Sequence, residues 1–301
     1  MIGRRSSPTP NPPIADEALA ERGTSAAGSA PGTASSARTG ETGTAPPRSG
    51  TRLLGTIPIS HEWFWLALIL VLGAGLRMWY LSEIVLYAPD FTALRQDLDV
   101  QDYQARAMLS GDWEVRPGVN DPKVYSTPYY RPPGYPYYLA AVYLFTDGSY
   151  LAPRVLQMLL GLGSAVLMFL LARALYGSGV GLITAFFMAT YWGFIYFEGE
   201  VNDPSLFVFL IPCLLLTLRA WALKMTFPRA LLAGLIVGCY AIMRPNILLF
   251  GPVIALWMAY MAWRRHSSWR IPRAWFGLAL AAFLVILPVT VRNYVVSGEF
   301  V

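Results

Sequence analysis

The stretch WFWLALILVLGAGLRMWYL, from Trp63 to Leu81, decides the fold class of this chain. It contains one charged residue, Arg77, and a helix of roughly 17–25 apolar residues is long enough to cross a bilayer. The block therefore predicts a membrane-spanning helix. Arg77 lies near the outer end of the block, where its long side chain can snorkel toward the lipid headgroups.

The composition of the whole chain supports this assignment. Of the 301 residues, 55% are hydrophobic and only 14% are charged, whereas soluble domains carry roughly 25% charged residues. Further apolar blocks follow the first, and together they predict an all-α, polytopic bundle of about seven transmembrane spans. The expected spans are residues 63–81, 155–172, 180–197, 204–218, 230–243, 246–263 and 274–291.

The amino-terminal segment differs in character. Residues 1–55 are rich in Ser, Thr, Pro, Gly and Ala and have no apolar period, which predicts a disordered tail. The segment also lacks the apolar core of a signal peptide. We expect two parts in the chain: this solvated tail and a transmembrane module over residues 60–301.

Lysine and arginine predict the orientation. The positive-inside rule places the tail in the cytoplasm, since the loops on that side are then richer in basic residues. Every Asp and Glu from Glu83 onward falls on the outer side. We interpret this clustering as a sign of a chemical role for the carboxylates, not as a signal for orientation. The basic residues expected inside are Arg173, Arg219, Lys224, Arg229, Arg264, Arg265, Arg270 and Arg273.

A long outer loop, residues 83–152, is expected to fold and to contain short interfacial helices, because it is rich in aromatic residues and prolines. One helix is predicted from Asp99, as the N-cap, to Leu109, ended by Gly111. Asp99, Tyr103 and Arg106 then share one face of it.

Three carboxylates, Asp97, Asp99 and Asp102, therefore lie just outside the bilayer. One interpretation is helix capping and solvated charge. The other is a general base, because a carboxylate near a low-dielectric surface can have its pKa raised toward the working pH.

The segment RPPGYP, Arg131 to Pro136, forms a second notable feature of the loop. Prolines fix φ, and we expect a sharp turn at Gly134. Arg131 then has a defined position, either as part of a structural corner that meets lipid headgroups or as a fork that grips a phosphate.

Other classes of site have little support. Cys213 and Cys239 lie inside expected spans and read as small buried residues, and the two histidines, His61 and His266, show no metal-ligand spacing. We expect no metal and no other cofactor. The net charge of +5 comes from scattered arginines, so a nucleic-acid partner is not expected.

From about residue 60 onward, the chain resembles the GT-C membrane glycosyltransferases, in the branch of protein O-mannosyltransferases and bacterial aminoarabinose transferases. The resemblance rests on several motifs in order. These are Asp99, Tyr103, Ala107 and Gly111 in the first outer loop, YRPPGYP at Tyr130–Pro136, RVLQ at Arg154–Gln157, RPN at Arg244–Asn246 and VRNYVVSGEFV at the end.

The resemblance implies a sugar transferase that uses a polyprenyl-phosphate donor at the outer face of a membrane, here the bacterial inner (plasma) membrane. It implies that Asp99 is the catalytic base and that the configuration of the sugar is inverted. The acceptor would be a glycan, lipid or protein, and membrane lipids surround the enzyme. The expected substrate-binding residues are Tyr103, Arg131, Glu198, Glu200, Asp203, Arg244 and Arg292.

Two departures from the family pattern stand out. Many relatives carry a Thr-Glu pair where this chain has Asp203-Pro204, so Glu198 and Glu200 of FEGE are alternatives for that role. Relatives also continue beyond the equivalent of Val301, so we expect an amino-terminal module or a truncated product.

The competing hypotheses are a transporter, a non-catalytic membrane protein or an inactive fragment of such a transferase. Transporters place charges inside spans and show inverted repeats. Here Arg77 is the only charge well inside the first apolar block, and no inverted repeat is visible.

Overall fold

The computed structural model describes residues 59–115 and 131–298. Within these ranges the secondary structure is helical and contains no strand, which confirms the expected all-α class. The expected disordered tail and residues 116–130 of the outer loop lie outside the described residues. The helices are α1 (Ile59–Glu83), η1 (Val85–Tyr87), α2 (Asp97–Ser110), α4 (Gly134–Thr146), α5 (Leu151–Tyr176), α6 (Ser178–Thr190), α7 (Trp192–Gly199), α8 (Pro204–Leu223), α9 (Phe227–Ala241), η2 (Pro245–Phe250), α10 (Gly251–Arg264), η3 (Ser268–Arg270) and α11 (Ile271–Ser297).

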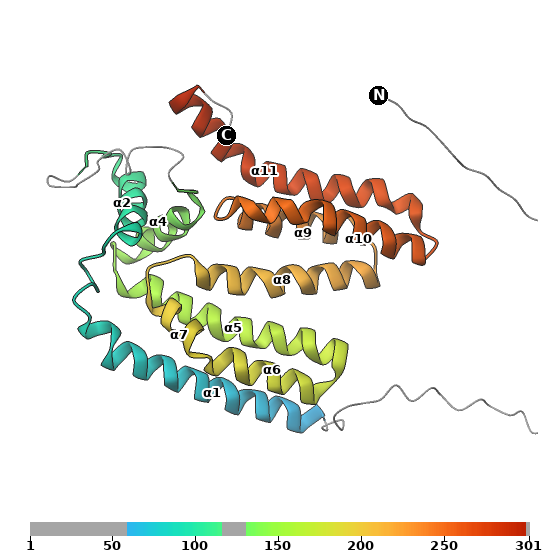
Figure 1. Ribbon diagram of the computed structural model, residues 1–301, viewed down its shortest axis with the longest axis horizontal. Helices are drawn as coiled ribbons and strands as arrows, with labels where there is room; N and C mark the ends of the chain where they lie inside the picture. The colour runs from blue at the N-terminus through green and yellow to red at the C-terminus, as the bar shows by residue number, and fades with distance from the viewer. Residues whose placement is uncertain (1–58, 116–130, 299–301) are drawn as a thin grey trace, which may run out of the picture. The chain divides into compact units, whose positions relative to one another are not determined.

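The long helices run back and forth between two ends of a bundle (Figure 1). Helices α2 and α4 pack on each other at one end, on the left in the figure. The turns that join α5 to α6, α8 to α9 and α10 to α11 lie at the other end. We call the first end the loop end and the second the basic end, because the basic residues expected in the cytoplasm lie in or close to these three turns.

The number of membrane spans differs from the expectation. Among the described residues, five helical segments are long and apolar enough to cross a membrane, and a sixth is obtained if the bent pair α6 and α7 counts as one span. Helix α9, with 15 residues, is shorter than the roughly 17–25 residues that a span needs. The count of seven is therefore not confirmed, although each expected span coincides with a helix or helix pair.

Close approach of backbones explains how short α9 holds its place. Gly234 and Gly238 lie one turn apart on α9, and a Cβ atom on either would meet the backbone of α11 at Leu278 or Ala282. Small residues four apart let two helices touch along their backbones. Gly73 does the same for α1, where it faces Ala189 of α6.

Two local predictions for the outer loop need correction. Helix α2 begins at Asp97, two residues before the expected start, because Gln96, with φ of 53°, turns the chain and accepts a hydrogen bond from Val100. Asp99 therefore lies in the first turn and is not the N-cap. The predicted end is confirmed, since Gly111 ends the helix with φ of 77°.

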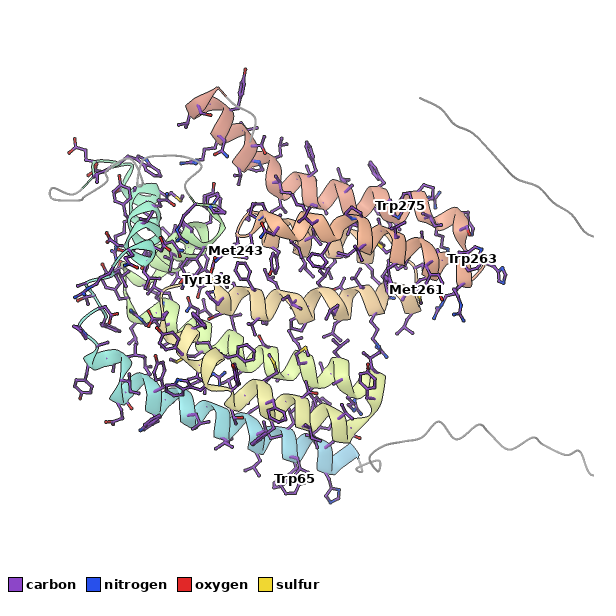
Figure 2. All side chains as sticks on the ribbon, in the orientation of Figure 1. Trp65, Tyr138, Met243, Met261, Trp263 and Trp275 are labelled. Atoms are coloured by element: carbon purple, nitrogen blue, oxygen red, sulfur yellow. The ribbon has the colours of Figure 1, made fainter. Side chains whose placement is uncertain are left out.

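The second correction concerns the RPPGYP corner. The bend lies at Arg131–Pro133, and Gly134 is already the first residue of α4 without a positive φ. Gly134 is required for another reason. Its N–H donates to the carbonyl of Ile242 at 2.9 Å, and a Cβ atom here would meet Ile242 and Met243. Met243 is labelled in Figure 2, where the end of α9 approaches α4.

Candidate active site at the loop end

Helix α2 is anchored by one of its three carboxylates, Asp102. Asp102 is 1% exposed and accepts hydrogen bonds from Arg106 Nε at 3.0 Å and from Tyr143 Oη at 2.7 Å. A third, longer bond of 3.3 Å comes from Tyr150 Oη. Burial and the neighbouring carboxylate raise the pKa of Tyr143, so this phenol remains a donor. Asp102 therefore ties α2 to α4 and to the start of α5.

The other two carboxylates face outward to different degrees. Asp97 is exposed and forms an ion pair with Arg131. Asp99 is half-buried in the first turn of α2. Asp97 and Asp99 therefore lie near the start of the helix, whereas Asp102 is buried and hydrogen-bonded to neighbouring side chains. The same helix thus carries a candidate base, Asp99, and a structural carboxylate, Asp102.

Arg131 stands at the edge of an apolar groove, which we call the loop-end groove. The groove has a volume of about 260 Å³ and is formed by the RPPGYP corner and the neighbouring ends of α9, η2 and α11. Among the described residues, the buried Nε of Arg131 finds no hydrogen-bond acceptor. A guanidinium with an unsatisfied N–H beside an apolar groove is well suited to an amphiphilic anion. The groove is lined by Arg131, Pro132, Pro133, Ala241, Ile242, Pro245, Leu248, Ile286, Val289, Thr290 and Asn293.

Arg292 and Tyr103 converge on Trp113. The hydroxyl of Tyr103 donates to the carbonyl oxygen of Trp113 at 2.5 Å, and the guanidinium of Arg292 lies 5.9 Å from the centre of the Trp113 ring. Arg292 also opposes the rise that burial causes in the pKa of Tyr137. The end of α11 therefore lies near α4 and near the segment that follows α2. Asn293, next to Arg292, lines the loop-end groove.

Asp203 and Arg244 form a second polar feature. Nε and Nη2 of Arg244 lie 3.2 and 3.3 Å from the two carboxylate oxygens of Asp203. The pair borders a hollow of about 280 Å³ together with Phe207 and Tyr240, whose rings stack at 4.7 Å. Segment η2, which follows Arg244, contributes to this hollow and to the loop-end groove. The two cavities are thus neighbours across one short helix.

Glu200 lies in a mixed electrostatic environment. Burial is the main cause of a raised pKa for its carboxyl group, Asp90 adds to the rise, and the Arg154 guanidinium opposes it. Asp90 is not among the site residues predicted from the sequence. A carboxyl group held this way favours its neutral form more than an exposed one does.

Glu198 has a different environment, inside the bundle. It is 2% exposed, and its carboxylate oxygens accept hydrogen bonds from Nε and Nη2 of Arg77 at 2.6 and 2.8 Å. Arg77 is also 2% exposed, so the expectation that it snorkels is wrong. Its Nη1 donates to the carbonyl of Ala189, at the end of α6, at 2.7 Å. The pair therefore holds the break between α6 and α7, where the chain bends by 45°.

Three of the sequence motifs are joined by hydrogen bonds. Tyr135 of YRPPGYP donates to Gln157 of RVLQ at 2.6 Å. The amide nitrogen of Gln157 donates to the carbonyls of Glu198 and Glu200, and Arg154 donates to the carbonyl between them, at Gly199. Arg154 and Gln157 are not among the site residues predicted from the sequence. Their spacing of three residues, which puts two polar side chains on one face of a span, was the available signal.

The loop end therefore brings most of the predicted site residues to three neighbouring places. Arg131 lines the loop-end groove and Arg292 donates a hydrogen bond to Asn293 of its lining. Asp203 and Arg244 share the second hollow, and Glu200 lies beside Arg154. Glu198 is set apart, because it faces Arg77. The described residues contain no group of three or more His, Cys, Asp or Glu side chains that could hold a metal ion.

Comparison with known proteins identifies the family. The sequence profile of the dolichyl-phosphate-mannose-protein mannosyltransferases matches residues 130–291, more than half of the chain. The match includes Arg131 and Arg244, whereas α2 with Asp99 lies before it. No curated protein and no solved structure matches the chain. The matched helices and the sites at their ends belong to a chain of the dolichyl-phosphate-mannose-protein mannosyltransferase family, whose members are membrane glycosyltransferases of the GT-C type.

Proposed function

We propose that this protein transfers a sugar from a polyprenyl-phosphate carrier to an acceptor hydroxyl, with inversion at the anomeric carbon. The acceptor belongs to a glycan, a lipid or a protein. The reaction takes place at the loop end, on the outer face of the bacterial plasma membrane, with the amino terminus in the cytoplasm.

The reaction needs one base and one cation. The acceptor oxygen attacks the anomeric carbon, and the bond between that carbon and the phosphate oxygen breaks with its electron pair leaving on the phosphate. Asp99 takes the proton of the attacking hydroxyl. A phosphate leaving group needs no proton, but a fixed cation lowers the energy of its developing charge. We assign this role to Arg131, with Arg292 as the second cation.

The observation that supports the proposal best is the position of Arg131. Its guanidinium lines the apolar loop-end groove and pairs with Asp97 at the start of α2, and its Nε has no acceptor among the described residues. A prenyl chain fits the chemistry of the groove, and a phosphate at its mouth would compete with Asp97 for Arg131.

The second hollow suits the sugar or the acceptor. Asp203 accepts hydrogen bonds and Arg244 donates them, and the stacked rings of Phe207 and Tyr240 offer an apolar wall. A few converging polar groups in a mostly apolar cavity are typical of small-molecule sites. Tyr103 and Glu200 complete the proposed substrate-binding set. For Glu198 the pairing with Arg77 favours a positioning role.

The test is equilibrium binding of radiolabelled polyprenyl-phosphate-mannose and of uncharged polyprenol to the purified protein in detergent. We expect Arg131→Lys to lose about tenfold in affinity for the phosphate ligand, because lysine keeps the charge but not the fork. Arg131→Ala should lose more, and neither change should alter binding of the polyprenol. Arg95→Ala is the matched control, since Arg95 is an exposed arginine of the same loop.

If Arg131→Ala keeps the wild-type preference for the phosphate ligand over the polyprenol, the corner is only structural and the phosphate binds elsewhere.

A further inference from the structure

A large apolar cavity of the described bundle lies at the basic end, and it shares no lining residue with the loop-end groove. It is a groove of about 560 Å³ between α5, α8 and α10, and we call it the basic-end groove. Its volume falls in the range of roughly 300–1,000 Å³ that ligand sites occupy. It is lined by Leu171, Leu175, Leu215, Leu218, Arg219, Ala222, Leu223, Val253, Ile254, Trp257, Met261 and Arg265.

The lining combines ten apolar side chains with two arginines from different helices. Arg219 lies in the last turns of α8, and Arg265 follows the last residue of α10. The ends of α8 and α10 that carry these two arginines lie at the basic end (Figure 1). Met261, labelled in Figure 2, marks this part of α10.

The two arginines differ in how they are held. Arg265 Nη1 donates to the carbonyl of Leu223 at 3.1 Å, which fixes it across the ends of α8 and α10. In the part of the chain that the structure describes, the guanidinium of Arg219 has neither a hydrogen bond nor an ion pair. The carboxylate near this end, Glu62, is already paired with Arg173 at 2.5 Å. Within residues 59–115 and 131–298, no carboxylate pairs with either of the two positive charges at this end of the apolar groove.

We propose that the basic-end groove binds an anionic diacyl phospholipid, with an acyl chain along the leucines and the phosphodiester between Arg219 and Arg265. The groove opens on the sides of membrane-spanning helices, so its natural occupant comes from the bilayer. Basic pockets between spans on the cytoplasmic side are typical sites for anionic headgroups. The charge of the arginines favours an anionic lipid over a zwitterionic one, and long acyl chains favour a lipid over free phosphate.

The basic side chains nearby strengthen the argument. Lys224, Arg270 and Arg273 surround a neighbouring hollow of about 280 Å³, where Arg270 and Arg273 lie against the ring of Trp269 at 4.9 and 5.7 Å. Arginine and tryptophan together are typical of a helix end at the headgroup level. These residues raise the local concentration of anionic lipid but do not line the basic-end groove.

The experiment is native mass spectrometry of the purified protein in detergent, titrated with palmitoyl-oleoyl phosphatidylglycerol. Phosphatidylcholine with the same chains tests the headgroup charge, and glycerol 3-phosphate tests the need for chains. We expect discrete binding of phosphatidylglycerol and weak binding of the other two. Arg219→Gln/Arg265→Gln should weaken phosphatidylglycerol about 10- to 30-fold, to the level of phosphatidylcholine.

The matched control is Lys224→Gln/Arg264→Gln, which removes two positive charges at the same end but outside the groove, and it should keep most of the affinity. Arg219→Gln alone guards against misfolding, because this side chain makes no hydrogen bond to any of the described residues. Leu215→Trp, which fills the groove at a partly exposed position, should weaken phosphatidylglycerol without any change of charge.

Two results would overturn the proposal. Equal loss in the two double variants would mean that the basic end attracts anionic lipid through its total charge alone. Stronger binding of polyprenyl phosphate than of phosphatidylglycerol, lost in Arg219→Gln/Arg265→Gln, would assign the groove to the carrier. The proposal does not depend on the transfer reaction and can fail or succeed separately from it.

Discussion

At the scale of single residues, α2 separates two kinds of carboxylate that look alike in the sequence. Asp102 is buried with Arg106, Tyr143 and Tyr150 and holds the loop helices together. Asp99, three residues earlier, is half-buried at the start of the helix. A substitution at either position should reduce activity, but for different reasons, so folding has to be measured beside turnover.

We expect Asp99→Asn to lower turnover by roughly 10²–10⁴-fold, the range for loss of a general base, while donor binding is kept. The measurement is the rate at which radiolabelled sugar passes from polyprenyl-phosphate-mannose to acceptors in membranes. Asp112→Asn, which changes an exposed carboxylate of the same loop, should retain the wild-type rate. Equal loss in both variants would remove Asp99 from the role of base.

Glu200 predicts a dependence of stability on pH. Its pKa in the folded protein is raised above the ordinary 4.5, mainly by burial, so the folded state binds more protons than the unfolded chain once the pH exceeds that value. The wild-type protein then loses stability as the pH rises through the folded-state pKa. Glu200→Gln removes this loss.

Thermal unfolding in detergent between pH 4 and pH 8 checks the prediction. We expect Glu200→Gln to unfold at a higher temperature than the wild type at pH 8, with the difference shrinking toward pH 4. Glu114→Gln, at an exposed position of the outer loop, should follow the wild-type curve. A difference that grows toward acid pH would contradict the raised pKa.

At the scale of elements, the break between α6 and α7 is the feature that most needs side-chain support. A broken helix leaves carbonyls without partners, and inside a bilayer such groups are costly. Arg77 supplies a donor to Ala189, and Glu198 neutralises the arginine. Gly161 makes room, because a Cβ atom there would meet the Glu198 carboxylate.

Removing either Arg77 or Glu198 alone should therefore destabilise the protein more than removing both. We expect Arg77→Leu or Glu198→Leu alone to destabilise the protein by about 3–5 kcal/mol, since each leaves a buried charge unpaired. The double variant should recover much of this loss, although Ala189 still lacks its donor. The two single variants and the double variant form a double-mutant cycle, which is measured by the yield of folded protein and by its resistance to denaturation in detergent. Additive losses in the double variant would show that the two side chains act independently.

At the scale of the whole molecule, the alternating helices separate the carboxylates of the outer loop from the arginines of the basic end. The positive-inside rule then predicts that the basic end faces the cytoplasm and the loop end faces outward. The same orientation places the proposed transfer site and the proposed phospholipid groove in opposite leaflets.

Cysteine labelling in intact cells checks this orientation. In a protein with Cys213 and Cys239 replaced by alanine, a cysteine in place of Asp112 should react with an impermeant maleimide added outside. A cysteine in place of Ser267, between α10 and η3, should react only after the cells are opened. The reverse pattern would invert the predicted topology and, with it, the leaflet of the donor.

The sequence by itself determined the fold class and the family. Long apolar blocks predict spanning helices because a bilayer offers no partner for an open backbone, and the motifs from YRPPGYP to RPN carry the resemblance that the family profile confirms. Gly111 as the end of α2 was also predictable, because a left-handed residue after a helix is a local property.

Only the tertiary structure decided which charged side chains are buried and paired. The sequence does not show which of Asp97, Asp99 and Asp102 is buried. Their burial depends on α4 and α5, which lie more than thirty residues away along the chain. The partner of Arg77 is 121 residues distant, at Glu198, and the bend beside it shortens a span that looked continuous. The local sequence indicates whether a side chain is more stable in water or in lipid. The role of a polar side chain depends on which groups of other helices lie within hydrogen-bond distance of it.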